Sequence, residues 1–247
     1  MPEEKSLKLL IVEDDPGIAT MLNAFFTSHD VNTQIAPDGK KALELVTTFT
    51  PDIIILDIVL PYVDGLSVLD KLRSNSIQIP VILLTDKSSV EEKLTGFEHG
   101  ADDYVTKPFS LKELWMRVQA ILRRGQSVTL TNEHRILSVG GLSINPLTRM
   151  INLLDSTTLS LTKTEFDLLY FLADRKNQAV PHTVILEEVM GYSPTSQTKA
   201  LVIHIANIRK KFDAQGVTDI ELQAVPGIGY KLIAIQPSET DVQEDLT

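Results

Sequence analysis

The sequence predicts two domains: an α/β domain built on a doubly wound parallel sheet over residues 7–124, and a smaller α+β domain over residues 134–236. Three observations support this prediction. In the first half, five short aliphatic runs alternate with five helical patterns, which is typical of a parallel sheet. Residues 125–133 are short, polar and aperiodic, as expected of a linker. In the second half, short β-like runs precede three amphipathic helices and a hairpin.

The composition limits the classes of function. The 247 residues include no cysteine, which excludes disulfides and thiolate metal sites. The start of the chain has no secretory pattern and no apolar run is long enough for a bilayer, so we expect a cytoplasmic protein without a membrane segment. The formal net charge of −10 argues against a general polyanion binder. Residues 134–236 nevertheless contain 10 basic and 9 acidic residues, and residues 237–247 read as a disordered acidic tail.

The elements of the first domain are predicted from aliphatic runs and helical spacing. Pro16 suits the first turn of a helix, Gly100 suits a helix end, and Ser110 with Glu113 forms a capping box. Aliphatic stretches predict strands over residues 7–12, 31–36, 53–57, 79–85 and 101–107. Helical spacing predicts helices over residues 16–26, 40–49, 66–72, 90–99 and 110–124.

Chemically complementary side chains follow four of these strands. Glu13 and Asp14 end the first strand, Asp57 the third, Thr85 the fourth and Lys107 the fifth. Because the carboxyl ends of parallel strands share one edge of the sheet, we expect these groups to converge. Crowded carboxylates without Cys or His suit Mg²⁺. A lysine and a hydroxyl suit a phosphoryl group, and a carboxylate can accept one as an acyl phosphate, although each residue alone is typical of an ordinary turn.

This half resembles a response-regulator receiver domain, whose sheet is flavodoxin-like. The resemblance rests on five motifs: Ile11-Val12-Glu13-Asp14-Asp15, Asp57 with Pro61 and Asp64-Gly65, Leu84-Thr85, Gly100-Ala101-Asp102-Asp103-Tyr104, and Lys107-Pro108-Phe109. It implies that Asp57 accepts a phosphoryl group from a sensor histidine kinase. It also implies that Mg²⁺ is held by Glu13, Asp14, Asp57 and the backbone carbonyl of Val59.

The same resemblance implies how the signal spreads. Thr85 and Lys107 contact the phosphoryl oxygens, and Tyr104 swings inward when Thr85 is drawn to the phosphate. Asp86 stands where the family usually has a small residue, so we expect altered rates of phosphorylation or dephosphorylation. The resemblance implies no enzymatic activity beyond loss of the phosphoryl group, which resets the switch.

The charged residues between residues 93 and 124 have two possible roles. The simpler one is a solvated helix face. In receivers joined to a winged helix, such charges pair across a two-fold interface, which implies a homodimer on activation. Each exposed pair contributes under about 1 kcal/mol, so only a network would hold such a dimer. The candidate interface residues are Lys93, Asp102, Asp103, Glu113, Arg117, Arg123 and Arg124.

The second domain is predicted as a small antiparallel sheet, three helices and a hairpin. Thr162 and Glu165 form a capping box for the first helix. The other two helices are expected over residues 181–190 and 197–212, and the hairpin over residues 225–233. The expected strands are Ile136–Val139, Leu142–Ile144, Met150–Leu154 and Thr158–Leu161.

This layout resembles the OmpR/PhoB-type transactivator DNA-binding domain, a winged helix. The matching motifs are Leu161-Thr162-x-x-Glu165-Phe166-x-Leu168-Leu169, Val202-x-His204-Ile205-x-x-Ile208-Arg209-Lys210-Lys211 and Gly227-x-Gly229-Tyr230. The resemblance implies that the third helix enters the major groove of double-stranded promoter DNA and the wing reaches the minor groove. The DNA-binding residues would be Thr198, Lys199, Val202, Ile203, Ala206, Asn207, Arg209, Lys210, Lys211 and Tyr230.

Departures from the family fall on this DNA face. Lys199, Val202, Asn207 and Pro226 replace residues that are usually arginine or acidic, so fewer guanidinium groups remain for phosphates and guanines. Val202 and Ala206 suit thymine methyl groups, and Asn207 suits adenine. The cations at residues 209–211 have an alternative role in balancing the helix dipole. His204 is expected to pack beside the apolar stripe rather than bind a ligand.

Together the resemblances imply a transcription regulator that phosphorylation of Asp57 switches to a DNA-binding homodimer. One alternative is a DNA-binding regulator whose receiver dimerises without phosphorylation, in which case Asp57→Asn would be silent. Another is a protein-interaction module with a weakened DNA face that docks on RNA polymerase or another regulator. Absence of salt-sensitive promoter binding would favour the last of these.

Overall fold

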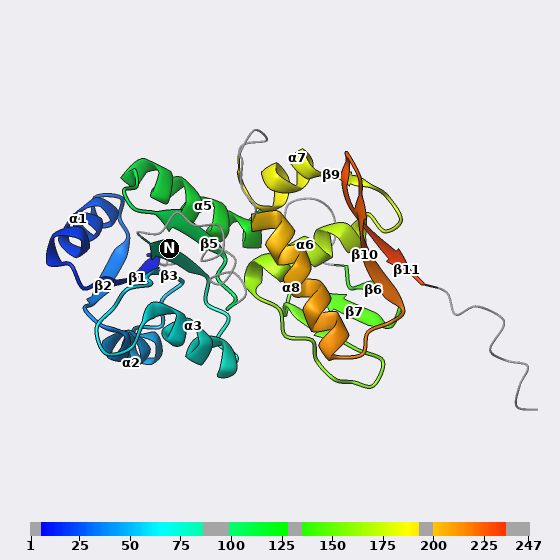
Figure 1. The fold of residues 1–247 in the computed structure, drawn as a ribbon, viewed down its shortest axis with the longest axis horizontal. Helices are drawn as coiled ribbons and strands as arrows, with labels where there is room; N and C mark the ends of the chain where they lie inside the picture. The colour runs from blue at the N-terminus through cyan, green and yellow to red at the C-terminus, as the bar shows by residue number, and fades with distance from the viewer. Residues whose placement is uncertain (1–5, 86–98, 128–134, 193–199, 236–247) are drawn as a thin grey trace, which may run out of the picture. The chain divides into compact units, whose positions relative to one another are not determined.

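The structure is a computed structural model of the 247-residue chain, and it describes residues 6–85, 99–127, 135–192 and 200–235. Contacts divide the chain into two compact units, residues 1–124 and 125–247. Figure 1 labels the helices and strands of both units.

The first unit contains a five-stranded parallel sheet in the order β2-β1-β3-β4-β5. This is the doubly wound order expected of a flavodoxin-like sheet, and it confirms the predicted fold class. The strands are β1 (Lys8–Val12), β2 (Asn32–Ala36), β3 (Ile53–Asp57), β4 (Val81–Thr85) and β5 (Asp103–Thr106). The helices are α1 (Pro16–Thr27), α2 (Gly39–Phe49), α3 (Gly65–Ser74) and α5 (Leu111–Ser127).

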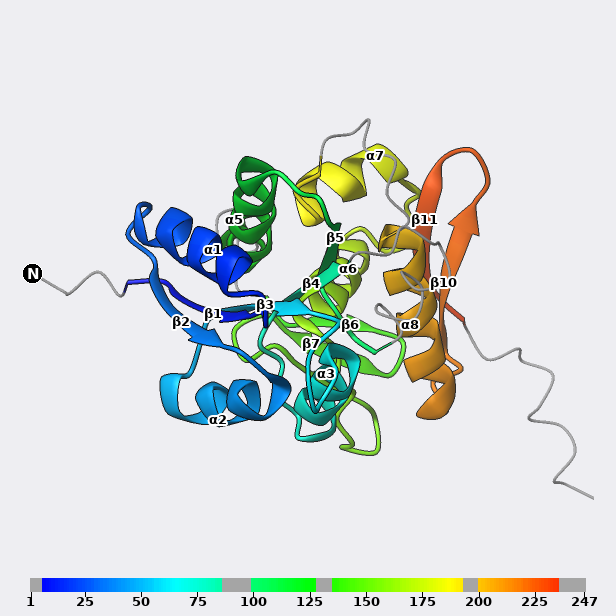
Figure 2. The same cartoon turned by 60° about the vertical axis from the view of Figure 1, so that its left-hand side comes forward.

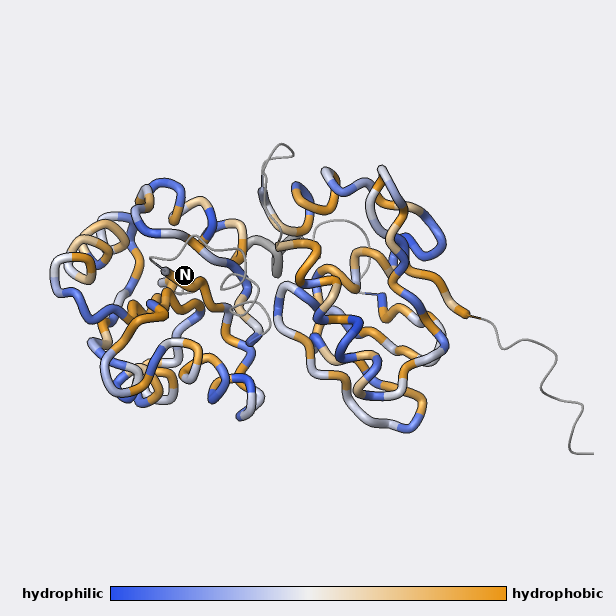
Figure 3. Tube along the Cα trace, viewed as in Figure 1, coloured by the Kyte–Doolittle hydropathy of each residue, from blue (hydrophilic) through white to orange (hydrophobic). Residues whose placement is uncertain are grey.

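Helices cover both faces of this sheet. Figures 1 and 2 show α1 and α5 on one face and α2 and α3 on the other. Strands β3 and β4 are buried along their whole length, as their aliphatic runs predict. Leu22 and Phe26 of α1 pack with Val118 and Ile121 of α5 in the core. Figure 3 shows the strands as a hydrophobic centre between more hydrophilic segments. The sheet is thus a rigid platform for its loops.

One predicted boundary differs from the structure, and one predicted helix lies outside the described residues. Helix α5 continues to Ser127, so the first three residues of the predicted linker are helical instead. A polar sequence that contains Gly125 does not exclude a helix, because a single glycine inside a helix costs only about 1 kcal/mol. The predicted helix over residues 90–99 falls almost entirely outside the described residues.

Aspartate caps fix the loops that follow β1 and β3. The Asp15 carboxylate accepts hydrogen bonds from the backbone N–H groups of Gly17 and Ile18, at 2.7 and 3.0 Å. Asp64 caps α3 in the same way, accepting from the backbone N–H and the hydroxyl of Ser67. These Ser67 hydrogen bonds lower the pKa of Asp64. Both loops therefore leave the sheet edge in a defined direction.

Gly65 allows the loop after β3 to fold back on that strand. A Cβ atom at this position would lie 2.0 Å from the backbone oxygen of Asp57, closer than any real contact. The Gly65 N–H also donates to the Ile58 oxygen at 2.9 Å. A side chain at residue 65 would therefore displace the carboxyl end of β3.

Gly65→Ala should lower the free energy of unfolding of the first unit by about 2 kcal/mol or more, because the contact is with backbone that cannot rotate away. Urea unfolding of the full chain measures this loss. Gly17→Ala is a matched control, since its nearest contact is a side-chain oxygen 3.0 Å away and its loss should stay under about 1 kcal/mol. Equal losses for the two variants would contradict the packing argument.

The second unit contains two small antiparallel sheets, β6-β7-β8 and β10-β11-β9, around three helical segments. The first sheet comprises β6 (Leu137–Val139), β7 (Leu142–Asn145) and β8 (Met150–Asn152). The second comprises β9 (Val180–Pro181), β10 (Ile220–Val225) and β11 (Gly229–Ala234). The helical segments are α6 (Lys163–Asp174), α7 (His182–Val184) with the π-helical turn η1 (Ile185–Val189), and α8 (Ala200–Ala214).

The winged-helix layout and the Thr162–Glu165 capping box are as predicted. Two local predictions are wrong. Thr158 forms only an isolated bridge with Asn152, so residues 158–161 are not a strand. Pro181 belongs to β9, where it lies opposite Gly229, and the second helix begins one residue later. Among the described helices, none is long and apolar enough to cross a membrane.

Candidate functional site

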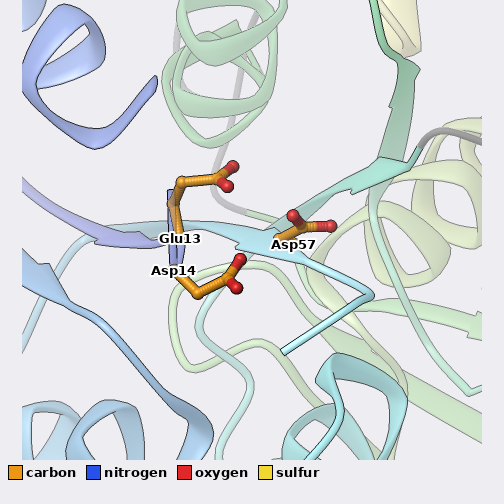
Figure 4. A group of neighbouring side chains, drawn as sticks. All are labelled: Glu13, Asp14 and Asp57. Atoms are coloured by element: carbon orange, nitrogen blue, oxygen red, sulfur yellow. The ribbon is translucent and has the colours of Figure 1, made fainter. Parts of the chain in front are cut away.

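Three carboxylates meet at the carboxyl edge of the parallel sheet. Asp57 is the last residue of β3, while Glu13 and Asp14 directly follow the neighbouring strand β1. One carboxylate oxygen from each lies within 4.8 Å of the others. Figure 4 shows the three side chains gathered at this edge. Glu13 and Asp57 are buried, each 2% exposed, whereas Asp14 is exposed. The convergence predicted from the strand ends is therefore present.

Lys107 bridges the two buried carboxylates. Its Nζ lies 2.6 Å from Asp57 Oδ2 and 2.8 Å from Glu13 Oε2. Its backbone N–H donates to the Thr85 oxygen at 2.7 Å, which ties the end of β5 to the end of β4. The lysine thus supplies a positive charge where two negative charges would otherwise repel.

Burial and charge shift the pKa values of this pair. Burial raises the pKa of Glu13, and the nearby Asp57 charge raises it further, against the opposing effect of Lys107. Burial by itself lowers the pKa of Lys107, but its hydrogen bonds to Asp57 and Glu13 outweigh this and raise that pKa overall. An ionised Glu13 is therefore costly in this place unless a cation compensates it. The oxygen-only donor set, with its excess of negative charge, fits a hard divalent cation such as Mg²⁺.

Mg²⁺ should raise the melting temperature of the first unit more at about pH 7.5 than at about pH 5. The raised pKa of Glu13 contributes stability that is present below its ordinary value of 4.5 and lost as pH rises through the raised pKa. The cation offsets that loss because it binds the ionised form of Glu13. At a concentration 100 times its Kd, Mg²⁺ should stabilise the folded state by about 2.7 kcal/mol. Thermal melts with and without Mg²⁺ measure the difference, and Glu13→Gln should flatten it. An equal rise at both pH values would contradict this.

The other predicted pocket residues lie around this cluster. Thr85 is the last residue of β4 and is 2% exposed. Tyr104 of β5 lies opposite Leu83 of β4 and is 9% exposed. The Val59 backbone N–H donates to Asp57 Oδ1 at 3.1 Å, so the loop after β3 curls around the carboxylate. The roles of Thr85, Tyr104 and the Val59 carbonyl stay predictions. Asp86 lies outside the described residues.

Two of the predicted interface residues are buried inside the first unit. Asp102 is fully buried and accepts from the Val81 backbone N–H at 3.0 Å and from the Arg73 guanidinium at 3.3 Å. Asp103 is 2% exposed and pairs with Arg117 at 3.1 Å. Both aspartates therefore pair with arginines of their own unit, and their role at a dimer interface stays a prediction.

The remaining interface candidates lie on or beside α5. Arg117 also pairs with Glu113 at 2.7 Å, and the Glu113 side chain is 51% exposed. The Arg117 side chain is only 22% exposed, and the role of both residues in a dimer stays a prediction. Lys93 lies outside the described residues, as do the side chains of Arg123 and Arg124.

Helix α8 exposes a narrower face than predicted. Val202 is 50% exposed, and Ala206 and Lys210 are also exposed. Ile203 and Asn207, by contrast, are only 5% and 6% exposed, so they lie off the exposed face of α8, and their role as DNA contacts stays a prediction. Helix α8 packs against α6 and buries a wider arc than its apolar stripe indicates.

Other predicted DNA contacts have partners within the second unit. Arg209 Nε donates to the Leu222 backbone oxygen at 2.9 Å, and Lys211 Nζ lies 2.6 Å from the buried Glu165 carboxylate. Tyr230 is 9% exposed, and burial raises the pKa of its phenol. These contacts hold α8 to the wing and to α6. Thr198 and Lys199 lie outside the described residues. His204 is fully buried, as predicted for a packed histidine.

The positioning roles of Asp15 and Gly65 are not predicted from the sequence. Asp15 precedes a proline at the start of α1, and this pairing is a recognisable helix-start signal. Gly65 follows Asp64 in a turn-like pair, but its close approach to Asp57 depends on tertiary packing that no local pattern reveals.

Comparisons with known proteins agree with this architecture. Residues 9–119 match the family described as response regulator receiver domain, and residues 156–232 match the family described as transcriptional regulatory protein, C terminal. The response regulator MprA of Mycolicibacterium vanbaalenii is 35% identical over 231 residues, which cover 94% of this chain and 99% of MprA. The transcriptional regulatory protein TrcR of Mycobacterium tuberculosis is 35% identical over 226 residues, covering 92% of this chain and 86% of TrcR.

A solved structure supports the fold. The structure of a RitR mutant matches with a TM-score of 0.76 and 23% identity, covering 92% of this chain and 99% of that chain. At this identity the similarity concerns the fold alone.

Proposed function

The chain belongs to the OmpR/PhoB-type response regulators, in which a receiver domain precedes a transcriptional regulatory domain, and we propose that phosphorylation of Asp57 is its input. The observation that carries this proposal is the buried Asp57 carboxylate, held 2.6 Å from Lys107 and beside Glu13 and Asp14. The donor is a phosphohistidine on a sensor kinase. Within the family the output is regulated transcription. We propose that this protein likewise acts on DNA, in the cytoplasm.

The chemistry is a phosphoryl transfer to a carboxylate. An Asp57 oxygen attacks phosphorus, an O–P bond forms, and the P–N bond to the kinase imidazole breaks, leaving an acyl phosphate. Glu13, Asp14, Asp57 and the Val59 carbonyl would hold Mg²⁺, whose charge offsets that of the carboxylates and phosphoryl oxygens. Lys107 and the Thr85 hydroxyl orient the transferred group. Attack by water on the acyl phosphate later releases phosphate and resets the carboxylate.

The switch then acts through the fourth and fifth strands. Thr85 moves toward the phosphoryl group, Tyr104 packs behind it, and the face around Glu113 and Arg117 joins a second copy. A homodimer brings two winged helices to repeated half-sites on promoter DNA. Helix α8 enters the major groove, with Lys210 contacting phosphate. Contact with RNA polymerase would follow from this promoter position.

A binding-site selection tests this function. Full-length protein is phosphorylated by acetyl phosphate with Mg²⁺ and presented with random duplex DNA. We expect a repeated half-site whose affinity rises at least about tenfold on phosphorylation and falls steeply with salt. Enrichment of no sequence, with or without phosphorylation, would contradict the proposal and favour a protein-interaction module.

Lys210→Ala and Lys211→Ala should have different effects. Lys210 is exposed, so its loss should reduce the slope of log K against log salt by about 0.9 and should destabilise the second unit less than the loss of Lys211. Lys211 neutralises Glu165, which is 1% exposed, so its loss should instead destabilise the second unit by about 1–3 kcal/mol. Salt titrations of DNA binding and urea unfolding of both variants measure the two effects. The reverse assignment would show that Lys211 is the phosphate contact.

A further inference from the structure

The exposed face of α8 is largely apolar where it would meet base edges. Val202, Ala206 and Lys210 are exposed and follow one another at intervals of four residues, so they form one stripe along the helix. We call these three residues the α8 stripe. Its two members nearer the described start of the helix carry only methyl groups, and the third carries a positive charge.

The polar residues beside the α8 stripe are buried or already bind other groups of the second unit. The Asn207 side chain is buried, at 6% exposed, so it is poorly placed to read adenine. Arg209 donates to the Leu222 oxygen and Lys211 to Glu165, which directs both cations into the second unit. The described part of α8 therefore exposes few side chains that could recognise bases by hydrogen bonds.

The charge of α8 favours DNA over a protein partner as the occupant of this stripe. Between Ala200 and Phe212 the helix has no acidic residue and carries three consecutive cations at its carboxyl-terminal end, of which Lys210 lies on the stripe. That end suits a phosphate, while the apolar end suits the groove floor.

We propose that the α8 stripe reads thymine by its C5 methyl group, which deepens and rests on the proposed DNA-binding function. Thymine is the base that presents an apolar group in the major groove. A valine or alanine against any other base edge would leave donors or acceptors without a partner. Val202 and Ala206 are about 6 Å apart along the helix, or roughly two base-pair steps. Each half-site therefore contains two thymines about two base pairs apart.

Deoxyuridine provides a sharp test, because it lacks only the methyl group of thymine. Selected half-site duplexes are prepared with uracil replacing thymine at one position at a time, and full-length protein is titrated with each. We expect affinity to fall about fourfold at two positions, the ratio typical of one buried methyl group. Val202→Ala should reduce the penalty at one of them, and Lys210→Ala should weaken all duplexes equally.

Leu154→Ala is the matched control, because Leu154 is 87% exposed and lies outside α8, so its penalties should equal those of the wild type. Binding that is strong and specific but indifferent to uracil at every position would overturn the thymine readout and leave DNA binding intact. Absence of any specific DNA binding would overturn both this inference and the DNA-binding function. Val202→Ala that binds a protein partner less well but DNA unchanged would assign the stripe to protein contact instead.

Discussion

Asp57→Asn should reduce transfer of a phosphoryl group to the chain by roughly two orders of magnitude or more. The amide preserves the shape of the carboxylate at the end of β3 but lacks the negative oxygen that attacks phosphorus. Incorporation of labelled phosphate from acetyl phosphate with Mg²⁺, together with sensitivity of the product to hydroxylamine, measures the loss.

Asp15→Asn is the matched control for this experiment. Asp15 also lies at the sheet edge, but its carboxylate caps α1 through Gly17 and Ile18. Asparagine caps helices about as well as aspartate, so the fold and the labelling should both persist. Labelling of the Asp57 variant at the wild-type rate would show that another carboxylate is the acceptor.

Lys107→Met should destabilise the first unit by about 3 kcal/mol in the absence of divalent cations. Methionine keeps much of the aliphatic length but removes the charge that lies between Glu13 and Asp57, whose side chains are only 1% and 3% exposed. Mg²⁺ should recover much of this loss, so it should stabilise the variant more than the wild type. Urea unfolding with and without Mg²⁺ measures both quantities.

Lys112→Met is the control, because Lys112 is exposed on α5 and its replacement should change stability by no more than about 0.5 kcal/mol. If Lys107→Met were as stable as the wild type and no more responsive to Mg²⁺, the lysine would not be the counter-charge of the pocket.

The fold of the first unit could be predicted because its signals are local. Four consecutive aliphatic residues before Asp57 predict a strand buried on both faces, and β3 is such a strand. The order of acidic, hydroxyl and basic strand ends then predicts their meeting at one edge. Lys107 lies 94 residues from Glu13, yet the parallel topology alone brings them to 2.8 Å.

Local sequence patterns fail for residues whose burial or pairing depends on contacts with distant parts of the chain. The sequence predicts Asp102 at a charged interface, but hydrogen bonds from the Val81 N–H and from Arg73 hold it fully buried in its own unit. Helical spacing correctly identified the apolar residues of α8 that face the core. It could not show that Asn207 is buried as well, or that Lys211 reaches Glu165, 46 residues away.

The most direct test of the central claim is sedimentation of the full-length chain with Mg²⁺ before and after addition of beryllofluoride, which mimics the phosphoryl group on a carboxylate. We expect the wild type to shift from monomer to dimer and Asp57→Asn to stay monomeric. If neither protein changes, or if both are dimers throughout, the pocket at Asp57 does not control assembly, and the chain is a regulator that works without phosphorylation.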